Sequence, residues 1–140
     1  MLGEAIAITT EAFRGKKDKG GKPYILHCLR VMMQMPRYDE ELMSIAVMHD
    51  LVEDTDYSLS DLYRLGFSER VVGGVGFLTH VKGVPYEDYI KVLASNTDAR
   101  LVKMADLQDN SDLTRLKGVT KKDFDRVEKY QKSFLYLSKT

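Results

Sequence analysis

The chain has 140 residues, 44% of them hydrophobic, and this is enough to bury a core and fold as one domain, residues 1–140. Its 21 basic and 21 acidic residues balance, which argues against a nucleic-acid partner, and no apolar run is long enough to cross a membrane. One cysteine excludes an internal disulfide framework, and no signal sequence is visible, so we expect a soluble, cytoplasmic protein.

Turn residues separate periodic apolar segments along the chain, and no segment alternates strictly enough to predict a strand. The pattern predicts an all-α fold, a compact single-domain helical bundle. Helices are expected near residues 2–13, 23–35, 39–53, 58–65, 68–79, 85–94, 97–110 and 120–138. Ser58 is expected to cap one helix that Gly66 ends, and Thr120 with Asp123 resembles a capping box.

The connection before the second predicted helix, residues 15–22, is basic and contains glycine, with the sequence GKKDKGGK. Two interpretations stay open. The segment either closes over the phosphate groups of a substrate, or it is a solvated lysine loop, which is the commoner case.

The predicted helix at 23–35 carries a histidine inside an apolar run. Val31 lies one turn after His27 on the same face, so the imidazole is expected to be buried. A lone histidine on an apolar face is more often a hydrogen-bonded core residue than a metal ligand. Cys28 is interpreted as a small packing residue, although a thiol beside a ligand is also able to sense redox state or bind an ion.

The predicted helix at 39–53 repeats this feature and adds acidic residues. Leu42 and Ile45 mark its apolar stripe, and helical spacing places His49 on the same stripe, where a leucine would be expected. Asp50 follows at once, and its simplest interpretation is a surface carboxylate near a helix end.

Two further acids, Glu53 and Asp54, fall at the end of this predicted helix. A solvated last turn explains them, but acidic side chains there oppose the helix dipole, which argues for a positive group nearby. In the predicted helix at 97–110, Asp106 lies one turn after the apolar Val102 and leans toward the core. Pairing with Lys103 on the same helix is its alternative explanation.

The segment VVGGVGFLTH at 71–80 is rich in glycine but lacks the order of a dinucleotide-binding fingerprint, so close helix packing is the favoured explanation. His80 ends it and is expected to be a hydrogen-bonded or surface histidine. Tyr86, Tyr89 and Tyr130 have faces suited to a purine, but tyrosine at helical spacing usually packs in the core.

Buried imidazoles and carboxylates need a common partner, because an unpaired buried charge is strongly unfavourable. One cation bound by two neutral imidazoles and two carboxylates would compensate His27, His49, Asp50 and Asp106. Mixed nitrogen and oxygen donors suit manganese, iron, zinc or magnesium, and an open site leaves positions for water and phosphate. The long separations between these residues lack the fixed spacing of a zinc finger.

Three blocks of the sequence, residues 17–31, 46–62 and 86–110, resemble the HD-domain phosphohydrolases. More narrowly, they are similar to the hydrolase domain of RelA/SpoT-type pyrophosphohydrolases of guanosine tetra- and pentaphosphate, which act in the stringent response. The blocks PYxxH, HDxxED and KxADLxDN appear in order over almost the entire chain, and each is more specific than a bare His-Asp doublet.

This resemblance implies a metal-dependent enzyme that releases pyrophosphate from guanosine 3′,5′-bis(diphosphate), a small-molecule nucleotide. Its implied metal ligands are His27, His49, Asp50 and Asp106, with Mn²⁺ the usual ion. Its implied catalytic residues, which position and deprotonate the attacking water, are Glu53 and Asp54. Its implied substrate-binding residues are Asn110, Lys19, Lys103 and Tyr24. The usual proline after the first histidine is Cys28 here.

Two departures from the long bifunctional members of the family bear on the substrate. The arginines expected in the first block and after Asn110 are Asp18 and Asp112, and both changes remove cationic contacts. Another HD-type nucleotidase or phosphodiesterase therefore stays open as an alternative. A non-catalytic nucleotide-binding module is a third, against which the intact Glu53 and Asp54 speak. The pattern specifies neither the nucleotide nor an oligomeric state.

Overall fold

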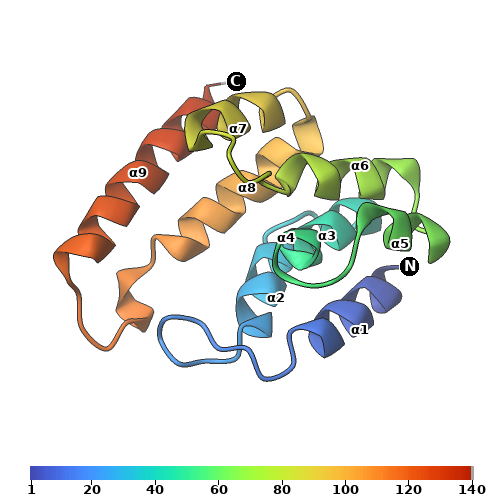
Figure 1. Ribbon diagram of the computed structural model, residues 1–140, viewed down its shortest axis with the longest axis horizontal. Coiled ribbons are helices and arrows are strands. Elements are labelled where there is room, and N and C mark those ends of the chain that lie inside the picture. Colours follow the sequence, from blue (N-terminus) through green and yellow to red (C-terminus); the bar gives the residue numbers. More distant parts are fainter. Residues whose placement is uncertain (140) are drawn as a thin grey trace.

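The computed structural model describes residues 1–139. Within this range, helices joined by turns and loops make up the fold, with a single isolated bridge between Lys17 and Pro23 and no strand. The all-α prediction is therefore confirmed (Figure 1). The helices are α1 (Leu2–Ala12), α2 (Ile25–Met33), α3 (Glu40–Val47), α4 (Leu51–Asp54), α5 (Leu59–Arg64), α6 (Glu69–Leu78), α7 (Tyr86–Leu93), α8 (Thr97–Asn110), the 3₁₀-helix η1 (Leu113–Arg115) and α9 (Lys121–Ser138).

Helix α3 lies in the middle of the bundle, where it packs against α1, α2, α6 and α8 (Figure 1). Its side chains Ile45, Ala46 and Val47 are fully buried, so this short helix is apolar around most of its circumference. Helix α8 also packs against α2 and along α9. The site described below lies where α2, α8 and the end of α3 meet.

Helix α6 approaches α3 closely because of a glycine. A Cβ atom at Gly74 would lie 2.6 Å from Ile45 Cδ1, well inside van der Waals contact. The close helix packing expected of residues 71–80 is therefore found at this position. The capping predictions are also confirmed: Ser58 with Asp61, and Thr120 with Asp123, form capping boxes.

The prediction of one helix over 39–53 was wrong. Helix α3 ends at Val47, a turn follows, and α4 begins at Leu51. The imidazole Nδ1 of His49 donates to the carbonyl of Ala46 at 2.7 Å, and so takes an acceptor that a continuous helix would offer to the backbone N–H of Asp50. Neighbouring residues on a regular helix do not face the same way, and the break allows His49 and Asp50 to do so.

Within residues 1–139, no helix combines the length and the apolar character that a membrane span requires.

Candidate metal centre and adjoining cavity

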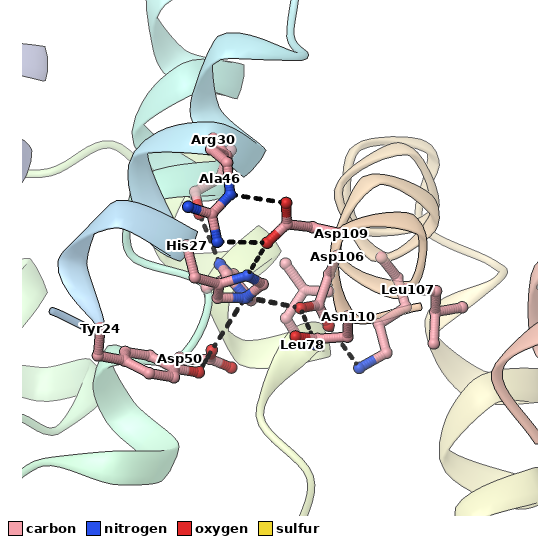
Figure 2. Close-up of polar contacts among 12 residues, drawn as sticks. Tyr24, His27, Arg30, Ala46, Asp50, Leu78, Asp106, Leu107, Asp109 and Asn110 are labelled. Carbon is pink, nitrogen blue, oxygen red and sulfur yellow. Dashed lines mark hydrogen bonds and ion pairs between the residues drawn. The ribbon is translucent and has the colours of Figure 1, made fainter. Parts of the chain in front are cut away.

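Four side chains from three distant segments of the sequence meet at one point. Helix α2 contributes His27, the turn between α3 and α4 contributes His49 and Asp50, and α8 contributes Asp106. One nitrogen or oxygen atom of each lies within 4.8 Å of the others. In Figure 2, His27, Asp50 and Asp106 point toward one another. Both imidazoles and Asp106 are buried, whereas the side chain of Asp50 is partly exposed.

The distances inside the cluster are short. His49 Nε2 lies 3.0 Å from Asp50 Oδ2 and 3.2 Å from Asp106 Oδ1. His27 Nε2 lies 3.0 Å from Asp106 Oδ1 and 3.8 Å from Asp50 Oδ2, and the two Nε2 atoms are 3.3 Å apart. Ligands of one ion at bonds of about 2.1 Å have spacings of this order.

The hydrogen bonds on the far side of each ring show which atoms face the cluster. Nδ1 of His49 donates to the carbonyl of Ala46, and Nδ1 of His27 lies 2.6 Å from a carboxylate oxygen of Asp109. With the protons on Nδ1, both Nε2 atoms carry lone pairs, and they face two carboxylates. Acceptors that converge in this way need a positive charge between them, so the donor set fits a divalent ion.

The pKa of His49 also shows that the cluster favours a positive charge. Burial acts to lower this pKa, but the charges of Asp50 and Asp106 outweigh burial and raise it well above the ordinary value. Burial acts to raise the pKa of Asp106, but Lys103 and His49 hold it well below the usual range. The cluster therefore attracts cations, whether protons or a metal ion.

The two oxygens of Asp106 face different partners. Its Oδ1 faces the imidazoles, and its Oδ2 accepts a 2.9 Å hydrogen bond from Lys103. Asn110 also donates to Oδ1 at 2.9 Å. Lys103 is only partly exposed beside the ring of Tyr89, with its Nζ 5.3 Å from the ring centre, and it contacts the carboxylate.

The two expected catalytic acids lie on α4, just beyond the cluster. Glu53 Oε1 accepts a 2.7 Å hydrogen bond from the backbone N–H of His80, and Asp54 Oδ2 lies 3.6 Å from Lys16 Nζ. Partial burial, followed by the charge of Asp50, raises the pKa of both carboxyl groups. A raised pKa makes each a better proton acceptor when it is ionised.

A cavity of about 360 Å³ adjoins the cluster. It is hereafter the basic cavity, and its lining residues are Lys16, Lys17, Asp18, Lys19, Gly20, Tyr24, Asn110, Asp112, Arg115, Leu116, Arg126 and Tyr130. Two of these residues connect it to the metal centre: the hydroxyl of Tyr24 donates to Asp50 Oδ2, and Asn110 donates to Asp106. Its volume is within the range of small-molecule sites.

Five basic side chains line this cavity against two acidic ones. Both acids accept hydrogen bonds from backbone N–H groups close by in the sequence. Asp18 Oδ1 accepts from Gly20 and Lys22 within its own loop, and Asp112 Oδ1 accepts from Thr114. The two departures from the family pattern therefore shape loops, and Lys16, Lys17 and Lys19 face a cavity suited to anions.

Sequence reasoning placed Tyr24, Lys19 and Asn110 in this region, and the structure brings all three to the cavity wall. It missed Arg115 and Arg126, which have no periodic or motif signal and reach the cavity only because α8 and α9 turn back on each other. It also missed Asp109, although this acid lies within the KxADLxDN block. His80 is hydrogen-bonded through Nε2 to the carbonyl of Val84, as expected.

Cys28 faces the core. Its side chain is fully buried, and burial raises the pKa of the thiol to about 12. Both observations agree with a packing role.

No family model matches the chain. Among curated proteins, it is 35% identical over 105 residues to guanosine-3′,5′-bis(diphosphate) 3′-pyrophosphohydrolase of Aquifex aeolicus, and 32% identical over 104 residues to the pyrophosphohydrolase MESH1 of Drosophila melanogaster. Each match covers 68% of this chain. The chain spans 15% of the first relative and 58% of the second.

A solved structure gives the same relationship. It belongs to a metazoan orthologue of SpoT that hydrolyses ppGpp (guanosine 3′,5′-bis(diphosphate)) and plays a role in starvation responses. The match has a TM-score of 0.77 and 25% sequence identity, and covers 97% of this chain and 84% of the other. In sequence over two thirds of its length, and in fold over nearly all of it, the chain is therefore similar to HD-domain hydrolases of ppGpp.

Proposed function

We propose that this chain is a metal-dependent phosphohydrolase that removes the 3′-diphosphate of guanosine 3′,5′-bis(diphosphate) as pyrophosphate. The observation that carries the proposal is the convergence of His27, His49, Asp50 and Asp106 beside a basic cavity. The printed names of the relatives, which are pyrophosphohydrolases of this nucleotide, support the choice of substrate. We further propose that residues 1–140 act as one hydrolase domain.

The metal would be held by the Nε2 atoms of His27 and His49 and by carboxylate oxygens of Asp50 and Asp106. We propose Mn²⁺, because this ion accepts imidazole nitrogen and carboxylate oxygen together. When bound, a divalent ion supplies Lewis-acid chemistry, since it polarises a phosphoryl oxygen and acidifies water.

Glu53, or Asp54 beside it, would accept the proton of the attacking water. The water oxygen forms a bond to the phosphorus attached to the ribose 3′ oxygen, the bond between that phosphorus and the 3′ oxygen breaks, and the 3′ oxygen takes up a proton. The hydrogen bond from the His80 backbone to Glu53 Oε1 holds this carboxylate in place and leaves its second oxygen for water.

The basic cavity would bind the anionic groups of the nucleotide. Lys19, Arg115 and Arg126 line it from three separate segments of the chain, and clustered cations attract polyphosphate. Lys16 also lines the cavity and lies close to Asp54, so it connects the phosphate-binding side with the catalytic acids. Tyr130 offers an aromatic face at the same wall.

A second candidate is hydrolysis of a smaller nucleotide by the same metal centre. The observation that favours it is the presence of Asp18 and Asp112 on the cavity wall, where long members of the family are expected to have arginines. Fewer cations would weaken binding of a substrate with two diphosphates more than that of a monophosphate.

One experiment separates these functions. The purified chain is incubated with Mn²⁺ and guanosine 3′,5′-bis(diphosphate), and in parallel with a panel of nucleoside mono-, di- and triphosphates, and both pyrophosphate and orthophosphate are measured. Pyrophosphate from the first substrate supports the primary proposal, and orthophosphate from the panel alone supports the second. Tight nucleotide binding without turnover would indicate a non-catalytic module. Asp50→Ala controls for contaminating hydrolases.

A further inference from the structure

Asp109 contacts the His27 ring at the nitrogen that points away from the metal cluster. Its Oδ2 lies 2.6 Å from His27 Nδ1 (Figure 2). The carboxylate is held from behind by Arg30, whose Nε and NH2 groups donate to its two oxygens at 2.8 and 3.1 Å, and by Arg115 at 3.3 Å. The side chain of Asp109 is only 13% exposed.

We propose that Asp109 is a positioning residue for the metal centre: it fixes the orientation and tautomer of His27 and thereby raises the affinity of the site for a divalent ion. This inference rests on the metal centre of the proposed function. It adds a residue that lies outside the four donors and to which the sequence assigned no role, although it stands in the KxADLxDN block.

The physical reason begins with the ring. A neutral imidazole has one N–H group and one lone pair, and its two nitrogens exchange these roles between tautomers. An ionised carboxylate only accepts hydrogen bonds, so a contact of 2.6 Å places the proton on His27 Nδ1 and the lone pair on Nε2. Nε2 is the atom that faces Asp106 at 3.0 Å. The selected tautomer is therefore the one that binds metal.

The two histidines are oriented by different partners. His49 donates to the backbone carbonyl of Ala46, which comes with the fold itself. His27 donates to a charged side chain, which makes a stronger hydrogen bond and increases the basicity of the ring nitrogen opposite. The orientation of His27 depends on the side chain of Asp109, so a substitution of Asp109 measures what this hydrogen bond contributes.

Asp109 stays in place because two guanidinium groups compensate its charge. Arg30 binds it as a planar fork, the geometry that orders a carboxylate most strongly. Arg115 also lines the basic cavity, so its substitution would disturb substrate binding as well. A substitution of Arg30 therefore tests how Asp109 is held in place without changing the basic cavity.

The test is titration of the full chain with Mn²⁺ by calorimetry, without substrate. Asp109→Ala is expected to raise the Kd for Mn²⁺ about 10- to 100-fold, the usual effect of removing the partner of a metal-bound histidine. Asp109→Asn is expected to lose less affinity for Mn²⁺, because its amide oxygen still accepts a hydrogen bond from His27 Nδ1. The Kd of Arg30→Gln for Mn²⁺ is expected to lie between the values of the wild type and of Asp109→Ala.

Asp98→Ala is the matched control. Asp98 is also on α8, also binds an arginine fork, that of Arg70, and is similarly buried, but it lies at the other end of the helix. Its Kd for Mn²⁺ is expected to equal that of the wild type. Circular dichroism of the metal-free variants checks that each is folded, and the isosteric Asp109→Asn keeps the test valid if the alanine variant unfolds.

Three results overturn the inference. Equal Kd values for the wild type and a folded Asp109 variant remove the positioning role and leave the metal centre intact. If Asp98→Ala loses as much affinity for Mn²⁺ as Asp109→Ala, general destabilisation of the fold explains both losses. A wild-type chain that binds no Mn²⁺ contradicts the metal centre itself, and the proposed function with it.

Discussion

The backbone N–H of His80 donates a 2.7 Å hydrogen bond to Glu53 Oε1 and so joins the segment after α6 to the end of α4. The His80 ring is fixed in turn, because its Nε2 donates to the carbonyl of Val84 and its plane stacks on Tyr89 at 4.6 Å. One carboxylate oxygen of Glu53 is thus anchored by a backbone group whose own side chain is held by two contacts. This anchoring is what a residue that positions water requires.

Glu53→Gln is expected to reduce turnover about a hundredfold or more, because the amide keeps an acceptor for the His80 N–H but does not take a proton from water. Metal content is expected to stay at the wild-type level. Steady-state kinetics and metal analysis of the same preparation give both quantities. Wild-type turnover in this variant would show that Glu53 is not the proton acceptor.

Asp50→Ala is expected to abolish metal uptake, because it removes an oxygen donor that lies 3.0 Å from His49 Nε2. Elemental analysis of protein purified without chelator measures the bound metal. Asp125→Ala removes an exposed carboxylate that pairs with Lys121, and serves as the control with full metal content. Metal retained at the wild-type level in Asp50→Ala would contradict the ligand assignment.

Turnover is expected to rise with pH through an acid limb that lies above the ordinary pKa of the carboxyl group that accepts the proton, about 4.3 for a glutamate and about 3.9 for an aspartate. Partial burial raises the pKa of Glu53 and of Asp54, and either carboxylate accepts a proton only after it has lost its own. The measurement is kcat against pH at saturating Mn²⁺, so that protonation of the imidazoles does not limit metal binding. An acid limb at or below the ordinary value would refute the role of burial.

Gly74→Ala is expected to lower the free energy of unfolding by about 1–3 kcal/mol, the usual cost of overpacking a core. The new Cβ atom would meet three side-chain atoms of Ile45, which is fully buried, so the two helices or the Ile45 side chain would have to shift. Gly73→Ala is the control on the same helix, since its Cβ would meet nothing within 4 Å. Urea denaturation compares the two, and an equal effect would argue against close packing at Gly74.

Cys28 is expected to resist alkylation in the folded protein. The thiol is fully buried, and burial raises its pKa to about 12, so neither access nor the reactive thiolate is available near neutral pH. Mass spectrometry after iodoacetamide treatment is expected to show one modification in denaturant and none without it. Rapid modification of the native protein would instead favour a redox or metal-binding role.

The helical pattern was readable from the sequence because it depends on local chemistry. Apolar periodicity placed α8 at its observed bounds, and the capping boxes at Ser58 and Thr120 marked the starts of α5 and α9. The break between α3 and α4 was not readable. It depends on one hydrogen bond from the His49 ring to the Ala46 carbonyl, and hydrophobic periodicity carries no information about such a bond.

By itself, the sequence determined which donor types the chain offers and, on regular helices, which of them are buried, because the position of a residue on an apolar helix face follows from spacing alone. His27 is buried as that spacing predicted, and His49 is buried too, although it lies in the turn after α3 and not on a helix. Only the tertiary structure decided that they meet, and that Asp109 and Arg115 join them from the end of α8 and from η1. Contacts between helices depend on how whole elements pack, and no local pattern along the chain encodes that distance.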